Sequence, residues 1–214
     1  MKHIKLKFDF YARDTHIVAK GLLGKLLVRQ WRNKVITGRI TEVESYVGIN
    51  DKACHASHGR TKRNEVMFGE AGHAYVYLIY GMYHCLNVVT ERENFPAAVL
   101  IRALEPVTGI DVMQQTRKGE ALVNLTNGPG KLTRALRIDK TLNGENLAVS
   151  DKLYVTDDGY KVSRDDIKAA ARIGVDYAGK DALLPWRYYL SVDFPCFTTR
   201  NVLPDSFVPP SYGG

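Results

Sequence analysis

The sequence predicts a mixed α/β fold of the α+β kind, in which helices surround a curved antiparallel sheet that carries a protruding β-hairpin. Runs of β-branched and aromatic residues follow one another across short turn signals, which is typical of antiparallel strands. Helical patterns are confined to the beginning and the middle of the chain. With 214 residues, 45% of them hydrophobic, we expect one domain over residues 1–214, with an extended tail from about residue 203.

The first element is a predicted helix within RDTHIVAKGLLGK, residues 13–25. Asp14 precedes the periodic residues and is a typical capping residue, and glycine follows at the other end. The helical period places Ile17, Val18 and Leu22 on one apolar side.

Two hairpins are predicted next. KLLVRQW and VITGRITEVESYVG are separated by RNK, which is a hairpin signal. AYVYLIY and YHCLNVV flank Gly81 and Met82, and a glycine that comes first in a two-residue loop fits a type II′ turn.

The remaining elements alternate between strand and helix. AAVLIRAL predicts a strand, GIDVMQQTRK and PGKLTRAL predict helices, and WRYYLSV predicts a last strand. KAAARIGV fits both the helical and the extended pattern.

The chain is basic. Thirty Lys and Arg residues against 23 Asp and Glu give a net charge of +7 and a pI near 9.2. This favours a polyanionic partner, although a solvated basic face without a partner explains the charge equally well.

Three cysteines, Cys54, Cys85 and Cys196, are far apart and form no CxxC pair, so neither a disulfide framework nor a thiolate zinc site is indicated. We expect no metal and no cofactor. The N-terminus lacks the apolar core of a signal peptide, and no run of 18 apolar residues occurs. We therefore expect no membrane association and a cytoplasmic location.

Two carboxylates and a ring share a strand face. In RITEVESYVG, side chains alternate, so Glu42, Glu44 and Tyr46 point to one side. The plainer interpretation is that both glutamates face water on an outer strand.

A polar segment, INDKACHASHGRTKRNEVMFGEAGHAYVY, follows this strand and carries His55, Arg60, Lys62 and Arg63. An irregular segment of this length is usually functional or disordered. His55 alone is more often a surface or packing residue than a catalytic one.

The second hairpin gathers rings. Tyr75 and Tyr77 share one face of the strand, which is also what a β-rich core would require. The tip, with Tyr80, Met82 and Tyr83, is unusually apolar for a turn. Apolar side chains beside arginines resemble the wedges that proteins insert between base steps.

NGPGKLTRAL, residues 127–136, puts glycine and proline before a basic helix whose free N–H groups suit a phosphate. The segment also resembles the hairpin of helix-hairpin-helix DNA-binding proteins, although the preceding RKGEALVNLT makes a poor partner helix.

Five segments occur in one order: TEVESYVG, YVYLIYGMYHCLN, LIRALEP, NGPGKL and ARIGVDYAG. Together they closely resemble the alkyladenine (3-methyladenine type) DNA glycosylase family, from about residue 14 to 189 and most clearly between 40 and 106. Residues 138–168 and 191–214 match no segment of it. The absence of the long N-terminal extension of larger members favours a compact, bacterial-type protein.

The resemblance implies excision of damaged purines by base flipping, without a metal; the substrates are alkylated purines, with deaminated purines as an open alternative. It assigns these roles: Glu44 as the general base that activates water, with Arg102 beside it; Tyr46, His55 and Tyr77 as the rings around the extruded base; Asn87 and Leu100 as pocket residues; and Tyr80 as the intercalating residue. From charge, Arg60, Arg63 and Lys131 are candidate phosphate-binding residues.

We therefore expect a monofunctional DNA-3-methyladenine glycosylase that acts on double-stranded DNA as a monomer and, in a bacterium, is associated with the nucleoid. No matched pocket position is a lysine, so no Schiff-base lyase step is expected. Two alternatives remain: a helix-hairpin-helix glycosylase, which requires a mostly helical protein, and a basic module that stacks single strands on its tyrosines.

Overall fold

The computed structural model describes residues 4–191. Cys196 and the predicted tail from about residue 203 lie outside the described residues.

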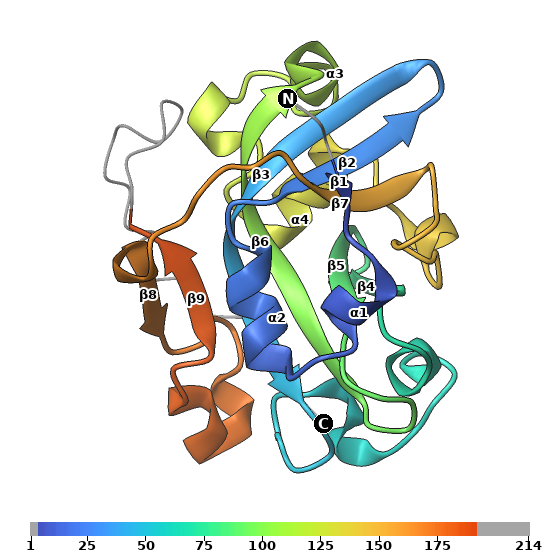
Figure 1. The fold of residues 1–214 in the computed structure, drawn as a ribbon, viewed down its shortest axis with the longest axis vertical. Coiled ribbons are helices and arrows are strands. Elements are labelled where there is room, and N and C mark those ends of the chain that lie inside the picture. Colours follow the sequence, from blue (N-terminus) through green and yellow to red (C-terminus); the bar gives the residue numbers. More distant parts are fainter. Residues whose placement is uncertain (1–3, 192–214) are drawn as a thin grey trace.

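An antiparallel sheet forms the body of the described chain, with helices around it (Figure 1), so the predicted α+β class is confirmed. The main path of the sheet runs β1-β7-β2-β3-β6-β5-β4, and β9 pairs with both β3 and β8. The strands are β1 Ile4–Lys5, β2 Leu26–Trp31, β3 Lys34–Val47, β4 Ala74–Ile79, β5 Tyr83–Val89, β6 Ala97–Thr108, β7 Leu153–Asp157, β8 Ile167–Ala170 and β9 Arg187–Leu190.

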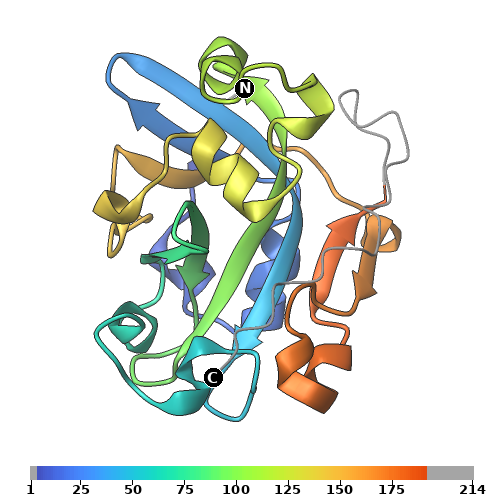
Figure 2. The same ribbon diagram turned by 180° about the vertical axis from the view of Figure 1, so that it is seen from behind.

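Helices lie on both sides of the central strands. In Figure 1, α2 lies in front of β3 and β6, and Figure 2 shows α4 on the reverse side, where it contacts β5 and β6. The helices are α1 Phe8–Tyr11, α2 Thr15–Leu22, α3 Ile110–Thr116 and α4 Pro129–Ala135, with short 3-10 helices η1 His55–His58, η2 Glu65–Phe68, η3 Leu122–Asn124, η4 Lys140–Leu142, η5 Arg164–Asp166 and η6 Asp176–Leu183.

β3 is a long strand with two different neighbours on one edge. Its first half pairs with β2 and its residues 42–44 pair with β9, while β6 follows it along the other edge. The β3–β6 register shifts on either side of Glu42. These bulges reverse the alternation, because core-facing residues are Ile36 and Ile40 before the shifts and Val43 after them. Glu42, Glu44 and Tyr46 therefore do lie on the face away from the core.

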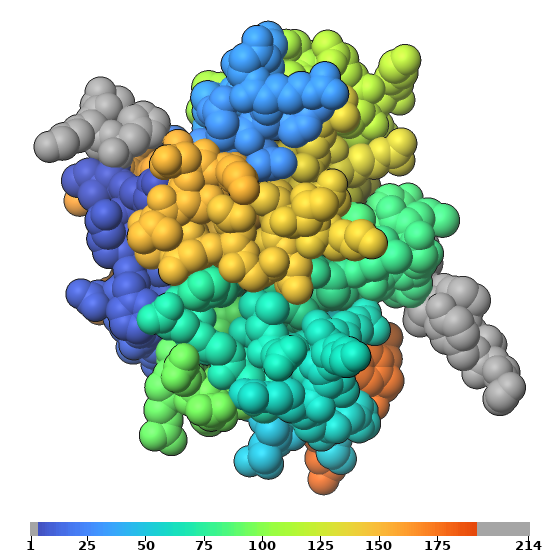
Figure 3. Space-filling model, turned by 90° about the vertical axis from the view of Figure 1, so that its right-hand side faces the viewer, coloured from blue at the N-terminus to red at the C-terminus, as the bar shows by residue number. Residues whose placement is uncertain are grey.

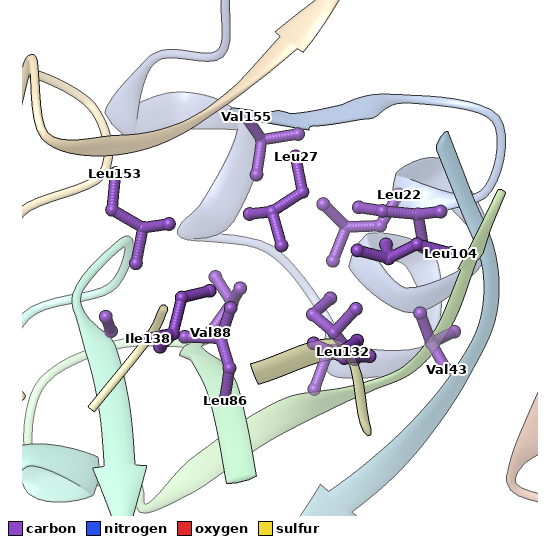
Figure 4. Close-up of a cluster of buried hydrophobic side chains, with 14 of the residues drawn as sticks. Leu22, Leu27, Val43, Leu86, Val88, Leu104, Leu132, Ile138, Leu153 and Val155 are labelled. Carbon is purple, nitrogen blue, oxygen red and sulfur yellow. The ribbon is translucent and has the colours of Figure 1, made fainter. Parts of the chain in front are cut away.

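The main core combines side chains of the sheet with those of α2 and α4 (Figure 4). Leu22 of α2 and Leu132 of α4 are completely buried, as are Leu27, Leu86 and Leu104 of three different strands. Each fully buried aliphatic side chain of this size contributes roughly 1.5–3 kcal/mol through loss of its contact with water. This core fixes the strands whose opposite face carries the candidate site.

The predicted first helix is confirmed, with one correction. Asp14 caps α2, since its carboxylate accepts hydrogen bonds from the N–H groups of His16 and Ile17, both at 3.0 Å. Val18 and Leu22 are buried, but Ile17 is 55% exposed. Placing Ile17 on the apolar side was wrong, because the helix contacts the sheet along a narrower stripe than the sequence pattern suggests.

The other predicted elements form, and KAAARIGV resolves into strand β8 followed by an irregular segment. The predicted type II′ turn was wrong. Ile79 pairs with Tyr83, so the loop between β4 and β5 has three residues, Tyr80, Gly81 and Met82. Tyr80 and Gly81 both have positive φ, 52° and 68°. The hairpin protrudes from the side of the molecule (Figure 3).

Gly109 joins β6 to α3 at a position that tolerates no side chain. Its φ is 71°, and a Cβ there would lie 2.8 Å from the carbonyl oxygen of Val35. We predict that Gly109→Ala lowers the free energy of unfolding by about 1–3 kcal/mol, measured by urea denaturation. Gly119 is the control, because its φ of 81° is also positive but no atom lies within 4 Å of its Cβ position. Equal losses in the two variants would show that the close contact has no effect.

Candidate active site

Four neighbouring strands place one residue each in a row across the sheet. Glu44 of β3 pairs with Leu100 of β6, Leu100 pairs with Asn87 of β5, and Asn87 pairs with Tyr75 of β4. Directly opposed residues of antiparallel strands project from the same face. The row therefore joins a carboxylate, an apolar floor, an amide and a ring on the side of the sheet away from the main core.

A cavity of about 690 Å³ opens over this row. This volume lies within the range of pockets that hold small organic ligands, and it exceeds what a single purine needs. Nine of the predicted site residues line it: Tyr46, His55, Arg63, Tyr77, Tyr80, Asn87, Leu100, Arg102 and Lys131.

Glu44 lies behind this lining and is fully buried, at 0% exposure. Its Oε2 accepts the hydroxyl of Tyr46 at 2.7 Å, and its Oε1 accepts the N–H of Ile173 at 2.8 Å. Nη1 of Arg102 lies 3.3 Å from the same Oε1. A buried carboxylate needs such compensation, because an unpaired charge in the interior is very costly. The plainer interpretation, in which both glutamates face water, was wrong.

Arg102 connects the two glutamates. It is only 7% exposed, and its Nε donates to Oε1 of Glu42 at 3.2 Å. Burial alone would lower the pKa of Arg102, but the charges of Glu44 and Glu42 outweigh it and raise the pKa above its ordinary value. Arg102 therefore provides a fixed positive charge beside the buried carboxylate.

The rings of His55 and Tyr77 form one wall of the cavity, and the ring of Tyr75 packs against both. The centroids of His55 and Tyr77 lie 4.5 Å apart, and those of Tyr75 and Tyr77 lie 5.2 Å apart. Nδ1 of His55 is 2.9 Å from the hydroxyl of Tyr75. Burial, together with the nearby charge of Arg63, lowers the pKa of His55 to about 4. His55 is therefore neutral at neutral pH.

Tyr46 lies on the other side of the row. Its strand, β3, is separated from β4 by β6 and β5, so Tyr46 and Tyr77 lie on opposite sides of the row. Leu100 and Asn87 lie between them. Burial, followed by the charge of Glu44, raises the pKa of Tyr46 well above its ordinary value, so its hydroxyl stays a donor.

Two further groups on β5 contribute to the cavity. Nδ2 of Asn87 donates to the carbonyl oxygen of Tyr75 at 3.1 Å, which fixes the orientation of the amide. Cys85 also lines the cavity, and burial raises the pKa of its thiol to about 11. The thiol is therefore protonated at neutral pH.

The mouth of the cavity is apolar and basic. Tyr80 and Met82 at the hairpin tip are 48% and 68% exposed. The guanidinium of Arg63 lies 5.4 Å from the ring centroid of Tyr77. Lys131 in α4 donates to Oδ1 of Asn127 at 2.9 Å, and partial burial, followed by the charge of Arg117, lowers its pKa.

Arg60 is not in the cavity lining. It donates to Oδ1 of Asn94 at 2.9 Å and lies over the ring of Phe68, so it belongs to the outer surface of the polar segment. The sequence also left residues of this cavity without a role. These are Ala53, Met67, Ile79, Tyr83, Cys85, Arg117, Glu120, Gly128–Gly130, Ile173–Val175 and Tyr177. The NGPGKL and ARIGVDYAG segments contain several of them and were the available signal.

Within residues 4–191, no group of three His, Cys, Asp or Glu side chains is arranged to hold a metal ion. None of the helices in the same range has the length and apolar character that a membrane span requires.

Comparison with known proteins identifies the family. The model of a family described as methylpurine-DNA glycosylase (MPG) matches residues 9–193. The chain belongs to this family. The match includes residues 138–168, which we could not assign from the sequence.

Three relatives can be aligned with this chain over almost their whole length, and their names are consistent with the family. The chain is 55% identical over 193 residues to a protein of Methanocella arvoryzae, with 90% of this chain and 94% of that protein covered. For Carboxydothermus hydrogenoformans the identity is 53% over 182 residues, with 85% and 93% covered. For Clostridium acetobutylicum it is 46% over 196 residues, with 87% and 94% covered. All three carry the name "Putative 3-methyladenine DNA glycosylase".

The protein is therefore a DNA glycosylase that removes alkylated purines in base excision repair, as the sequence predicted. The helix-hairpin-helix alternative was wrong, because the described residues form a β-rich fold. The single-strand-binding alternative was also wrong, because the family is enzymatic.

The lowered pKa of His55 predicts a stability change with pH. Between pH 6.5 and about 4, the unfolded chain binds a proton at this residue that the folded chain does not. The free energy of unfolding therefore decreases as the pH is lowered through this window. We predict that His55→Gln loses less stability than the wild type between pH 7 and pH 4.5, by about 2 kcal/mol. Urea denaturation of both proteins at each pH measures the difference, and parallel curves would contradict it.

Proposed function

We propose that the protein flips an alkylated purine out of double-stranded DNA into the 690 Å³ cavity and hydrolyses its glycosidic bond with a water activated by Glu44. The product is an intact abasic strand. The observation that carries this proposal is the fully buried Glu44, held by two hydrogen bonds and an ion pair directly behind the lining of an aromatic cavity. All of these residues come from one chain, so the proposal requires only a monomer.

The rings supply the binding energy for the extruded base. Stacking on an aromatic side chain contributes about 1–3 kcal/mol per base, which offsets the few kcal/mol that extrusion costs. In our proposal the base stacks between Tyr46 on one side and His55 and Tyr77 on the other. Alkylated purines that carry a positive charge gain further from electron-rich rings. Since His55 has a pKa of about 4, it does not repel such a base at neutral pH.

Asn87 is our candidate for selection among purines. Its Nδ2 donates one of its two protons to the carbonyl oxygen of Tyr75, which leaves Oδ1 as an acceptor and one N–H as a donor. In our proposal these fixed groups select among purines by the hydrogen-bonding pattern of the base edge that faces them. Leu100, its cross-strand neighbour, gives the floor an apolar surface.

The chemistry needs one carboxylate in the ionised form. An ionised carboxylate has about four lone-pair sites, and contacts with Tyr46, Ile173 and Arg102 use three. In our proposal the fourth, on Oε2, accepts a water molecule that enters with the substrate, because Glu44 has no exposed surface in the free protein. As the bond from the sugar carbon to the purine breaks, its electron pair leaves with the purine. The water oxygen bonds to that carbon and gives a proton to Glu44, whose charge also stabilises the oxocarbenium-like sugar.

Lys131 lines the cavity, which the sequence did not predict, because we had counted it only as a phosphate contact. In our proposal it keeps this role together with Arg63 at the mouth and Arg60 farther out. Its amino group is hydrogen-bonded to Asn127, and Glu44 is already suited to activate water. We therefore retain a hydrolytic reaction without a Schiff-base step.

Tyr80 is the proposed wedge. Its ring is half exposed at the tip of the hairpin and still borders the cavity into which the base would turn. An apolar side chain that enters the vacated stack lowers the cost of extrusion.

Glu44→Gln tests the chemical role. The amide keeps the shape but cannot take a proton, so we predict single-turnover excision of 7-methylguanine from a duplex to fall at least about 100-fold. Binding to the same duplex should change less than about threefold. Strands should break only after alkali treatment, as expected for an abasic product. An excision rate within a few-fold of the wild type would remove Glu44 from the mechanism.

Tyr80→Ala tests the wedge. We predict the largest loss of excision for a lesion in a stable base pair and the smallest for the same lesion opposite a mismatch or an abasic gap, where extrusion costs less. Tyr77→Ala should impair excision whatever lies opposite, because it removes a wall of the cavity. Met82→Ala, at the same tip, is the surface control. A uniform loss for Tyr80→Ala with a large drop in melting temperature would indicate a packing role instead.

A further inference from the structure

A completely buried ion pair lies beside the candidate active site but does not line its cavity. Nη1 of Arg172 is 2.6 Å from Oδ2 of Asp51, and Nη2 is 2.8 Å from Oδ1, with both side chains at 0% exposure. Arg172 follows β8, and Asp51 follows β3. The two residues are 121 positions apart in the sequence.

The pair ties three chain segments together. Arg172 also donates to the carbonyl oxygens of Ser45 and Asp181, each at 3.0 Å. Asp51 accepts the N–H groups of Val47 at 3.1 Å and Ala53 at 3.0 Å. The end of β3, the loop after it and η6 are therefore fixed to one another through a single guanidinium.

The same guanidinium supports a ring of the cavity. Its central carbon lies 4.9 Å from the ring centroid of Tyr46 and 5.0 Å from that of Trp186. Tyr46 lines the cavity and donates to Glu44. Arg172 thus contacts a residue that has both a binding and a chemical role in the proposed reaction.

The residue after Arg172 reaches Glu44 directly. The N–H of Ile173 donates to Oε1 of Glu44 at 2.8 Å, and Ile173 also borders the cavity. Consecutive Cα atoms are 3.8 Å apart, so a shift of Arg172 is transmitted to this N–H. Both hydrogen-bond donors to Glu44, Tyr46 and Ile173, are consequently held by the Asp51–Arg172 pair.

We infer that Asp51 and Arg172 are positioning residues for base excision, which act by holding Tyr46 and the N–H of Ile173 against Glu44. This inference rests on the proposed role of Glu44. A buried ion pair adds little stability compared with apolar residues of similar volume. Its better-attested role is to fix one particular arrangement of the segments that it joins. The planar guanidinium serves four acceptor atoms at once, which lysine, with its single ammonium group, does not reproduce.

Arg172→Lys and Asp51→Asn test the inference in the full chain. We expect both variants to bind a duplex with one 7-methylguanine within about threefold of the wild type and to excise it about 10- to 100-fold more slowly in single turnover. For Arg172→Lys, which keeps the charge, the acid side of the pH–rate profile should move to higher pH, because a carboxylate that loses donors holds a proton more tightly. The other ionisable groups near Glu44 are unchanged in both variants; they are Glu42, Tyr46, Cys85, Arg102, Tyr177 and Arg187.

Arg39→Lys and Asp158→Asn are the matched controls. This pair is also bidentate, at 3.1 and 2.9 Å, and partly buried, but contacts Gly24 instead of the active site. The controls should lose stability and keep the wild-type rate and pH profile. The inference is overturned if Arg172→Lys keeps the wild-type rate and profile, or if its rate falls without a change in profile, as for a general loss of folding.

Glu44→Gln separates the two hypotheses. If Glu44→Gln is inactive while Arg172→Lys is fully active, only the positioning role is wrong. If Glu44→Gln is fully active, the proposed function is wrong, and with it the role of the pair.

Discussion

The burial of Glu44 is the constraint on which the rest of the site depends. A carboxylate removed from water is stable only where donors replace its hydration, and here they come from Tyr46 in the same strand, Arg102 in the neighbouring strand and the N–H of Ile173 beyond β8. Two register shifts between β3 and β6 flank Glu42, two residues before Glu44. β9, which pairs with β3 at residues 42–44, covers the edge that β2 leaves open at this point. The sheet is thus irregular next to Glu44, whose negative charge needs hydrogen-bond donors and a positive partner.

In the proposed mechanism, different groups recognise the base and carry out the chemistry. Neutral rings, with His55 kept unprotonated by burial and by Arg63, form the walls that a base would contact. The negative charge lies behind them, next to the fixed positive charge of Arg102. This arrangement suits a substrate whose base is already a good leaving group, because the enzyme then needs a stabilising carboxylate and a water more than it needs a general acid.

Local patterns predicted much of the fold and of the site, and their failures have physical reasons. Alternation along β3 and β4 correctly grouped Glu44 with Tyr46 and Tyr75 with Tyr77, because side-chain direction in a strand is a local property. Strand pairing is not local, so the three-residue loop at Tyr80 was missed. Arg172 was missed as well, since its partner Asp51 is 121 positions away. The burial of Glu44 likewise depends on contacts from distant segments.

The central claim, that Glu44 stabilises positive charge on the sugar, is tested most directly by comparing two abasic-site analogues in a duplex. A pyrrolidine analogue carries a cationic nitrogen in its ring, and a tetrahydrofuran analogue is neutral with the same shape. We expect the wild type to bind the pyrrolidine duplex at least about 100-fold more tightly, as for other transition-state analogues, and Glu44→Gln to lose this preference. Equal affinities in the wild type, or a preference that persists in Glu44→Gln, would contradict the account.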